Sequence, residues 1–129
     1  MKLRIVTPTR ILVDAEVSEV RAPGTAGQIG VLPQHVTFLG QMDIGVVSYV
    51  ENGKARNVVV RGGYVEVVND VVTILADDAE LAAETDTAGA RAEADRLREE
   101  LKHAQGTPED IDRLLDALRI AEARSSVAS

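Results

Sequence analysis

The sequence contains no cysteine and no tryptophan, and only three of its 129 residues are aromatic. Without cysteine there is no disulfide framework and no thiolate metal site, which is compatible with a reducing compartment. With so few aromatic rings, the chain also lacks the stacking platforms that bind single-stranded nucleic acid. These absences exclude a disulfide-stapled secreted domain and disfavour a nucleic-acid binder.

Basic charge and long apolar runs are also scarce. Fourteen Lys and Arg residues stand against 21 Asp and Glu residues, so the net charge is -7. Nucleic-acid phosphates and anionic lipid surfaces repel such a chain. Its apolar runs are far shorter than the roughly 20 residues that span a bilayer, and its N-terminus lacks the apolar core of a signal peptide. We therefore expect a soluble, cytoplasmic protein that binds no nucleic acid and inserts no segment into a membrane.

Valine and alanine divide the chain into two regions. Of the 18 valines, 17 precede residue 85, whereas nine of the 17 alanines lie in the last 45 residues. β-branched residues favour strands, and Ala, Leu, Glu and Arg favour helices. The composition predicts a β domain over residues 1–84 and a helical domain over residues 85–129.

In the first region, short apolar runs alternate with turn residues. Strands are predicted over residues 2–6, 10–13, 16–22, 44–50, 55–60, 64–68 and 71–75. Asn52–Gly53 and Asn69–Asp70 are two-residue hairpin signals because these residues tolerate positive φ. Gly62–Gly63 predicts a bend or bulge inside the sheet. This close spacing is typical of a sandwich or barrel of short antiparallel strands and not of alternating βαβ units.

In the second region, apolar residues recur at helical spacing. The two apolar seams are Ala90, Ala94, Leu97, Leu101 and Ala104, and Ile111, Leu114, Leu115, Leu118 and Ala121. Between them, Gly106 is a helix stop, and Thr107, Pro108 and Asp110 are the N-cap, first residue and capping-box acid of a second helix. The short connection predicts an antiparallel helical hairpin. Because its first seam is mostly alanine, the hairpin is marginal alone and must pack on the sandwich or on a partner.

No local pattern indicates catalysis or metal binding. The segment 24–30 spaces its glycines as GxxGxxG, unlike the dinucleotide fingerprint, and predicts a tight loop between strands. His35 and His103 lie in different regions, so we expect no metal site; His35 is interpreted as a polar contact residue and His103 as part of the last turn of the first helix. Asp77 and Asp78 are neighbours in an extended segment, so their carboxylates point to opposite faces. This pattern predicts a solvated strand end rather than an acid–base pair.

Three segments resemble the epsilon subunit of bacterial F-type ATP synthases. They are MKLRIVTP at residues 1–8, APGTAGQIGVLPQH at residues 22–35, and GGYVEV at residues 62–67 followed by VTILAD at residues 72–77. The resemblance implies a non-catalytic rotor subunit of the central stalk, which links the gamma subunit to the c-ring at the cytoplasmic face of the bacterial inner membrane. It places Gln28 in the ring-facing loop and His35 at the gamma contact. Many members carry an acidic residue where this chain has Gln28.

In that family the helical hairpin either folds against the sandwich or extends along gamma into the alpha/beta catalytic hexamer, where it blocks ATP hydrolysis. The resemblance implies that basic residues of the last helix contact the catalytic head, and these are Arg113, Arg119 and Arg124 in this chain. At helical spacing, Arg113 and Arg124 share a face and Arg119 points elsewhere. Acidic neighbours dilute this charge, so we expect weak inhibition.

Some members of the family bind ATP through an Ile/Leu-Asp-x-x-Arg-Ala motif. This chain has Arg91 and Ala92, with Arg98 two turns further along the helix, but Thr87 and Ala88 replace the apolar residue and the Asp. Because the carboxylate is missing at Ala88, we expect weak ATP binding and no bound cofactor.

Two other hypotheses stay open from the residues alone. One is a free-standing adaptor or transcription-type factor whose helical hairpin probes a channel in a partner protein. The other is an enzyme that acts through Asp77 and Asp78.

Overall fold

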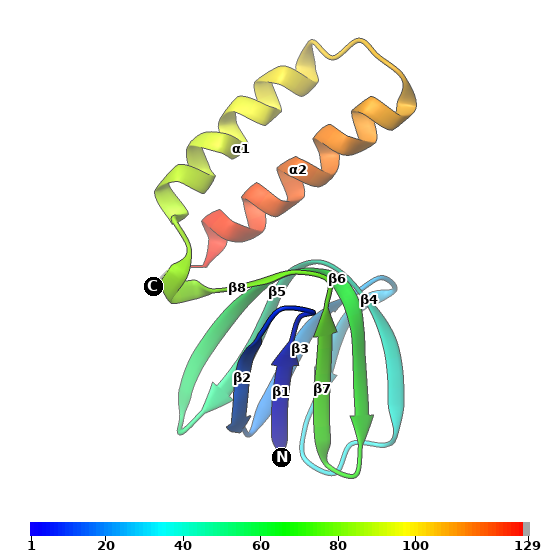
Figure 1. Ribbon diagram of the computed structural model, residues 1–129, viewed down its shortest axis with the longest axis vertical. Coiled ribbons are helices and arrows are strands. Elements are labelled where there is room, and N and C mark those ends of the chain that lie inside the picture. The colour runs from blue at the N-terminus through cyan, green and yellow to red at the C-terminus, as the bar shows by residue number, and fades with distance from the viewer. Residues whose placement is uncertain (128–129) are drawn as a thin grey trace.

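Residues 1–127 are described by the computed structural model, in which eight strands precede two helices (Figure 1). The strands are β1 (Lys2–Val6), β2 (Ile11–Glu16), β3 (Glu19–Gly24), β4 (Gly27–Val31), β5 (Phe38–Glu51), β6 (Lys54–Val68), β7 (Val71–Ala76) and β8 (Ala79–Leu81). A 3₁₀ turn, η1 (Ala82–Glu84), connects them to α1 (Thr87–Lys102) and α2 (Pro108–Ser126). The predicted β-sandwich followed by a two-helix hairpin is confirmed.

All strands belong to one sheet, which folds into two layers without closing. The order is β2-β1-β7-β6-β5-β3-β4, and β8 pairs with β6. β6 pairs with β7 through its second half and with β8 through its first half, so this strand passes from one layer to the other. The pairs are antiparallel, as predicted, with the exception of β1 and β7, which are parallel.

The longest strands differ from the short ones that the sequence predicts. β5 has 14 residues and β6 has 15, and β6 joins the two predicted strands 55–60 and 64–68. Gly62 and Gly63 lie between these halves with φ of 74° and 113°. The predicted bend is therefore present, but the ladder continues through it because the pairing of β5 with β6 keeps its register on both sides.

The core of the sandwich is made of aliphatic side chains that alternate along each strand. On β6 the inward side chains include Val58, Val60, Val65 and Val67, all fully buried. The other core residues are Leu3, Ile5, Val13, Val17, Val20, Ala22, Val31, Met42, Val47, Tyr49, Val72, Ile74, Ala76 and Ala79. Every residue of this sandwich core thus precedes the helices.

The hairpin begins and ends largely where the capping residues predict. Thr107 Oγ1 accepts a hydrogen bond from the Asp110 amide at 3.2 Å, and Pro108 is the first residue of α2, which confirms the predicted capping box. α1 ends at Lys102, earlier than predicted. His103 is therefore the C-cap residue and Ala104 lies outside the helix. Among residues 1–127, no helix combines the length and the apolar character that crossing a bilayer requires.

Candidate functional site

Two ion pairs join α2 to the sandwich. Arg124 donates to Glu80 on β8 from Nε at 2.9 Å and from Nη2 at 3.3 Å. Both side chains are about three-quarters buried, with exposed fractions of 28% and 24%. A two-point guanidinium–carboxylate pair of this kind is both directional and stronger than a single contact.

The second ion pair lies further from the C-terminus. Arg119 Nη2 is 2.6 Å from Asp43 Oδ1 on β5, and the Ile44 amide donates to the same oxygen at 2.8 Å. The hydrogen bond from Arg119, followed by the one from Ile44, lowers the pKa of Asp43 below its ordinary value of 3.8. The Asp43 carboxylate is thus held charged and oriented toward α2.

Arg113 lies apart from these contacts and pairs with Asp110 of its own helix at 3.3 Å. Sequence spacing groups Arg113 with Arg124, yet the structure brings Arg119 and Arg124 to the sandwich. Sequence reasoning did not find their partners Asp43 and Glu80. The pairs join residues far apart in the chain, so no local spacing signals them.

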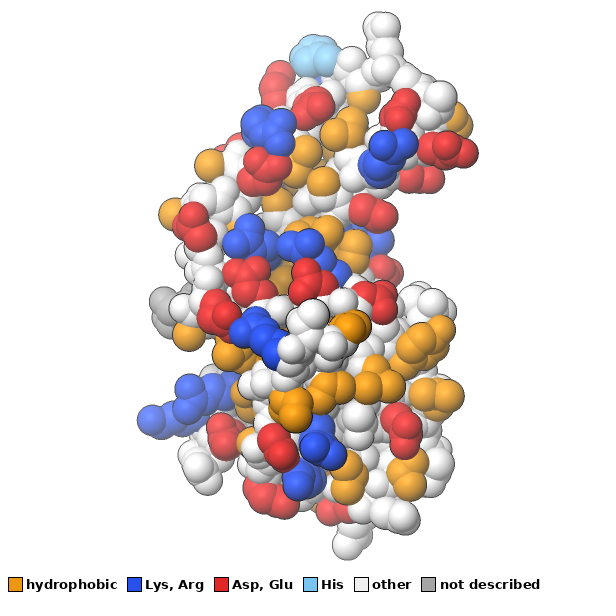
Figure 2. Space-filling model, viewed as in Figure 1, with side chains coloured by type: hydrophobic (Ala, Val, Ile, Leu, Met, Phe, Trp, Pro, Cys, Tyr) orange, Lys and Arg blue, Asp and Glu red, His pale blue; other side chains and the backbone are white. Residues whose placement is uncertain are grey.

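An exposed apolar row crosses the outer face of the sandwich. Ile11, Val6, Leu75 and Tyr64 are successive cross-strand partners on β2, β1, β7 and β6. Ile11, Leu75 and Tyr64 are 60%, 47% and 51% exposed. Leu39 on β5 is diagonal to Tyr64 and is 69% exposed. We call these five residues the apolar face; Figure 2 shows apolar side chains gathered over the sandwich. Contiguous exposed apolar surface marks an interaction site.

The loop 32–37 extends the exposed apolar surface and holds His35. Leu32 and Val36 are 60% and 74% exposed. His35 is half-buried, with its ring edge-on to Phe38 at 6.1 Å between centroids. Its Nδ1 lies 2.8 Å from the Val36 carbonyl oxygen. Because that oxygen only accepts hydrogen bonds, Nδ1 carries a proton, which leaves Nε2 as the nitrogen available for a partner.

Gln28 lies on β4, where it is exposed and pairs with Pro23 of β3. The prediction of a loop over residues 24–30 was wrong, because Gly27–Val31 is a strand and only Thr25–Ala26 form the turn. Gly24 and Gly27 permit that turn: a Cβ at Gly24 would overlap the Gly27 carbonyl oxygen, and Gly27 has φ of 125°. No helix follows, so the segment does not form a dinucleotide-binding turn.

The residues of the degenerate nucleotide motif lie on α1. Arg91 and Ala92 are exposed. Arg98 Nη1 pairs with Asp95 at 3.0 Å, and its Nη2 lies 3.5 Å from Glu122 on α2. Arg98 is thus engaged within the hairpin. ATP binding at these residues stays a prediction.

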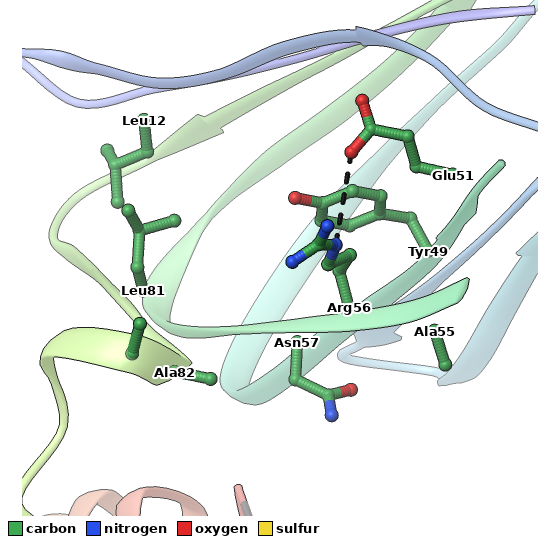
Figure 3. Close-up of a pocket in the computed structure, with 9 residues that line it drawn as sticks. Leu12, Tyr49, Glu51, Ala55, Arg56, Asn57, Leu81 and Ala82 are labelled. Atoms are coloured by element: carbon green, nitrogen blue, oxygen red, sulfur yellow. Dashed lines mark ion pairs between the residues drawn. The ribbon is translucent and has the colours of Figure 1, made fainter. Parts of the chain in front are cut away.

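A pocket of about 440 Å³ lies between the β5–β6 hairpin and the segment that leads to α1 (Figure 3). Tyr49 is one of its lining residues, and burial raises the pKa of the Tyr49 hydroxyl above its ordinary value. Glu51 and Arg56 form a 4.0 Å ion pair at its edge, and Leu12 and Leu81 supply an apolar wall.

Elsewhere, Asp78 lies 3.6 Å from Arg61. Within residues 1–127, no three potential metal ligands converge on one point.

Comparison with known proteins supplies the family. Residues 1–82 match the family model described as the beta-sandwich domain of the ATP synthase delta/epsilon chain. The chain is 42% identical over 129 residues to the ATP synthase epsilon chain of Solibacter usitatus, across 99% of this chain and 95% of that one. The chain belongs to the ATP synthase epsilon chain family. It is also similar to the epsilon chain of Nitratidesulfovibrio vulgaris, with 40% identity over 98% of this chain and 94% of that one.

Chains of two solved ATP synthase structures share the fold at lower identity. A chain of the Euglena gracilis mitochondrial ATP synthase superposes with a TM-score of 0.81 at 22% identity, covering 94% of this chain and 76% of that chain. A chain of the Tetrahymena thermophila mitochondrial ATP synthase central stalk and c-ring superposes with a TM-score of 0.66 at 12% identity, covering 97% and 96%. Both matches extend across the sandwich and the hairpin of this epsilon-family chain.

Proposed function

We propose that this epsilon-family chain is a central-stalk rotor subunit of an F-type ATP synthase. It links gamma to the c-ring, and its helical hairpin regulates ATP hydrolysis by the alpha/beta hexamer. Family membership supports the role, and the apolar face is the observation that carries the docking function. A protein partner is the expected occupant, because burying exposed apolar surface is the main driving force of stable association.

The apolar face and loop 32–37 together form the proposed gamma contact. Leu75 and Tyr64 supply its centre, and His35 lies in the loop that adjoins it, with Nε2 free to reach a polar group on gamma. The loop is held in place because the Gln34 amide donates to Asp70 at 2.8 Å. Rigid placement of this kind lowers the entropic cost of binding.

Gln28 and the β3–β4 turn form the proposed c-ring contact. Gln28 is exposed and offers an amide instead of the carboxylate that the family often carries there. A neutral amide both donates and accepts hydrogen bonds. We therefore expect the ring contact to depend less on salt concentration than a charged contact would.

The chain itself is proposed to have no catalytic activity. Asp78 Oδ1 accepts a hydrogen bond from the Ala79 amide at 2.9 Å, and Asp78 Oδ2 lies 3.6 Å from Arg61; the backbone amide of Asp77 donates to the Gly62 carbonyl at 3.4 Å. This arrangement supports a strand junction rather than an acid–base pair. As part of the synthase, the chain would be peripheral at the cytoplasmic face of the bacterial inner membrane.

Capture of gamma by the full chain tests the docking role. Leu75→Asp and Tyr64→Asp place a charge in the apolar face, so each should weaken gamma binding at least tenfold, since charges are excluded from interface cores. Leu115→Asp is the matched control, because Leu115 is also a half-exposed leucine (43%) but lies on α2. Normal gamma binding by both face variants, or no binding by the native chain, would overturn this role.

The regulatory role is tested separately in the assembled head. Removal of residues 85–129 should raise ATP hydrolysis, and an engineered disulfide that locks the hairpin to the sandwich should do the same. Unchanged hydrolysis in both cases, with assembly verified, would leave the hairpin with a structural role alone.

A further inference from the structure

The hairpin rests on the sandwich through a small apolar contact. The buried core of the hairpin consists of three residues, Ala94, Leu97 and Ala121, two of which have only a methyl side chain. All three lie within the hairpin. Toward the sandwich, α2 contacts β5 and β6. Val58 and Val60 on β6 point into the sandwich core, and side chains alternate along a strand, so Val59 faces outward. Val59 is nevertheless buried, because it lies on the side of α2. A contact of this size leaves the polar groups around it to decide how the hairpin sits.

Two carboxylates of the sandwich stand where α2 approaches. Glu80 pairs directly with Val59 in the β6–β8 ladder, so the Glu80 side chain lies on the same outward face. Asp43 lies on β5 between the paired residues Met42 and Ile44, opposite Gly62, and its Oδ1 is oriented by the Ile44 amide. Both carboxylates are thus placed by the sheet and not by the hairpin.

Two of the three arginines of α2 meet these carboxylates. Arg124 contacts Glu80 at 2.9 and 3.3 Å, and Arg119 contacts Asp43 at 2.6 Å. The third, Arg113, pairs within α2. The same arginines are the cations that α2 has to offer to an acidic surface of another subunit. In the docked hairpin, Glu80 occupies Nε and Nη2 of Arg124, and Asp43 occupies Nη2 of Arg119, whose Nη1 lies 3.7 Å from Asp116 of α2. These donors are then not available to a carboxylate of another subunit.

We propose that Asp43 and Glu80 form a two-point latch that holds the hairpin against the sandwich by occupying Arg119 and Arg124. When the hairpin leaves the sandwich, both pairs break, and the freed guanidinium groups can contact carboxylates of an acidic protein surface instead of Asp43 and Glu80. Docking on the sandwich therefore competes with contact to that surface for the same guanidinium donors. This inference rests on the proposed regulatory function for the identity of the acidic surface, which is the catalytic head.

The latch is testable in the isolated full chain. Because the chain has no cysteine, Lys54→Cys and Gln105→Cys introduce a unique pair of spin labels on the sandwich and at the hairpin tip. Pulsed electron paramagnetic resonance then measures the docked fraction. The double variant Asp43→Asn with Glu80→Gln keeps the shape of both side chains and removes both charges. We expect it to lower the docked-to-released ratio by about tenfold, the combined effect of two partly exposed ion pairs.

A matched control removes two other carboxylates. Glu93→Gln with Asp95→Asn breaks pairs with Arg96 and Arg98 within α1 and should leave the docked fraction unchanged. A second variant exchanges the charges of one pair, Glu80→Arg with Arg124→Glu, and should stay docked. An undiminished docked fraction in the Asp43/Glu80 variant, or an equal loss in the control, would overturn the latch.

The assembled complex separates the latch from the proposed function. If the latch holds and the hairpin inhibits, the Asp43→Asn/Glu80→Gln variant should hydrolyse ATP more slowly than the native complex, because more hairpins are released. If the spin labels report release while removal of residues 85–129 has no effect on hydrolysis, the latch stands and the regulatory role fails. If the spin labels report no release, the latch fails whatever the hydrolysis rate.

Discussion

Gly63→Ala is expected to be among the most damaging single-methyl additions in the sandwich. Gly63 lies where β6 passes from its β8 partner to its β7 partner, and its φ is 113°, a conformation that side chains disfavour. A Cβ there would overlap the Leu75 carbonyl oxygen and lie 2.8 Å from the Ala76 Cα. Both obstacles are backbone atoms of the paired strand, so the ladder itself must move.

The magnitude follows from two costs. Holding alanine in this region of φ costs about 1–3 kcal/mol, and forcing a methyl group into filled space costs about another 1–3 kcal/mol. The expected loss is about 2–6 kcal/mol out of the free energy of unfolding of about 5–15 kcal/mol that typical domains have. For a domain of this size, that corresponds to a drop in Tm of roughly 8 °C or more.

Two glycines provide graded controls. Gly53 in the β5–β6 turn has φ of 75° but open space around it, so Gly53→Ala should cost about 1–2 kcal/mol. Gly30 on β4 has neither a positive φ nor a neighbour within 4 Å, so Gly30→Ala should change stability by about 1 kcal/mol at most. Thermal unfolding of the full chain, followed by far-UV circular dichroism, checks the series. The reasoning is refuted if Gly63→Ala loses no more stability than Gly53→Ala.

Three further predictions concern the domains, the nucleotide and pH. A chain ending at residue 84 should unfold cooperatively and still capture gamma, because every core residue of the sandwich precedes α1; a truncated chain without a cooperative melt would contradict this. Titration calorimetry of the isolated chain with ATP should give weak or undetectable heat, and Thr87→Ile with Ala88→Asp should strengthen binding; tight ATP-selective binding by the native chain would show that the site lies elsewhere. Because the pKa of Asp43 is lowered, its pair with Arg119 contributes to docking above pH 3.8 and is lost as the pH falls through the lowered pKa. The distance between the spin labels should therefore lengthen in that acid range. The Asp43→Asn substitution should abolish this step.

Much of the fold follows from local sequence signals. The change from valine to alanine marks the passage from sheet to helix, and Asn52–Gly53, Asn69–Asp70 and the Thr107 capping box mark turns and a helix start that the structure confirms. Each signal acts within a few residues, through φ preferences or a single hydrogen bond. The division at Glu84 stays a prediction.

The errors arise where long-range pairing overrides a local signal. Local preferences predict that Gly62 and Gly63 end a strand. In the structure β6 continues through both glycines, because it pairs with β5 on one side and with β7 and β8 on the other. The glycine-rich segment 24–30 likewise contains a strand because Gly27–Val31 pairs with β3. Hydrogen bonds to a partner strand outweigh the conformational freedom of glycine.

The sequence alone determined the two-part architecture, the start of the second helix and the family resemblance, because these depend on composition, spacing and contiguous motifs. Tertiary structure alone decided the candidate surfaces. The apolar face exists because sheet register aligns single residues from several strands. No local pattern distinguishes these exposed residues from the buried apolar residues beside them. The pairs Arg119–Asp43 and Arg124–Glu80 exist because α2 comes to rest over β5 and β8. Such contacts depend on how distant segments pack, and no rule of local spacing contains that information.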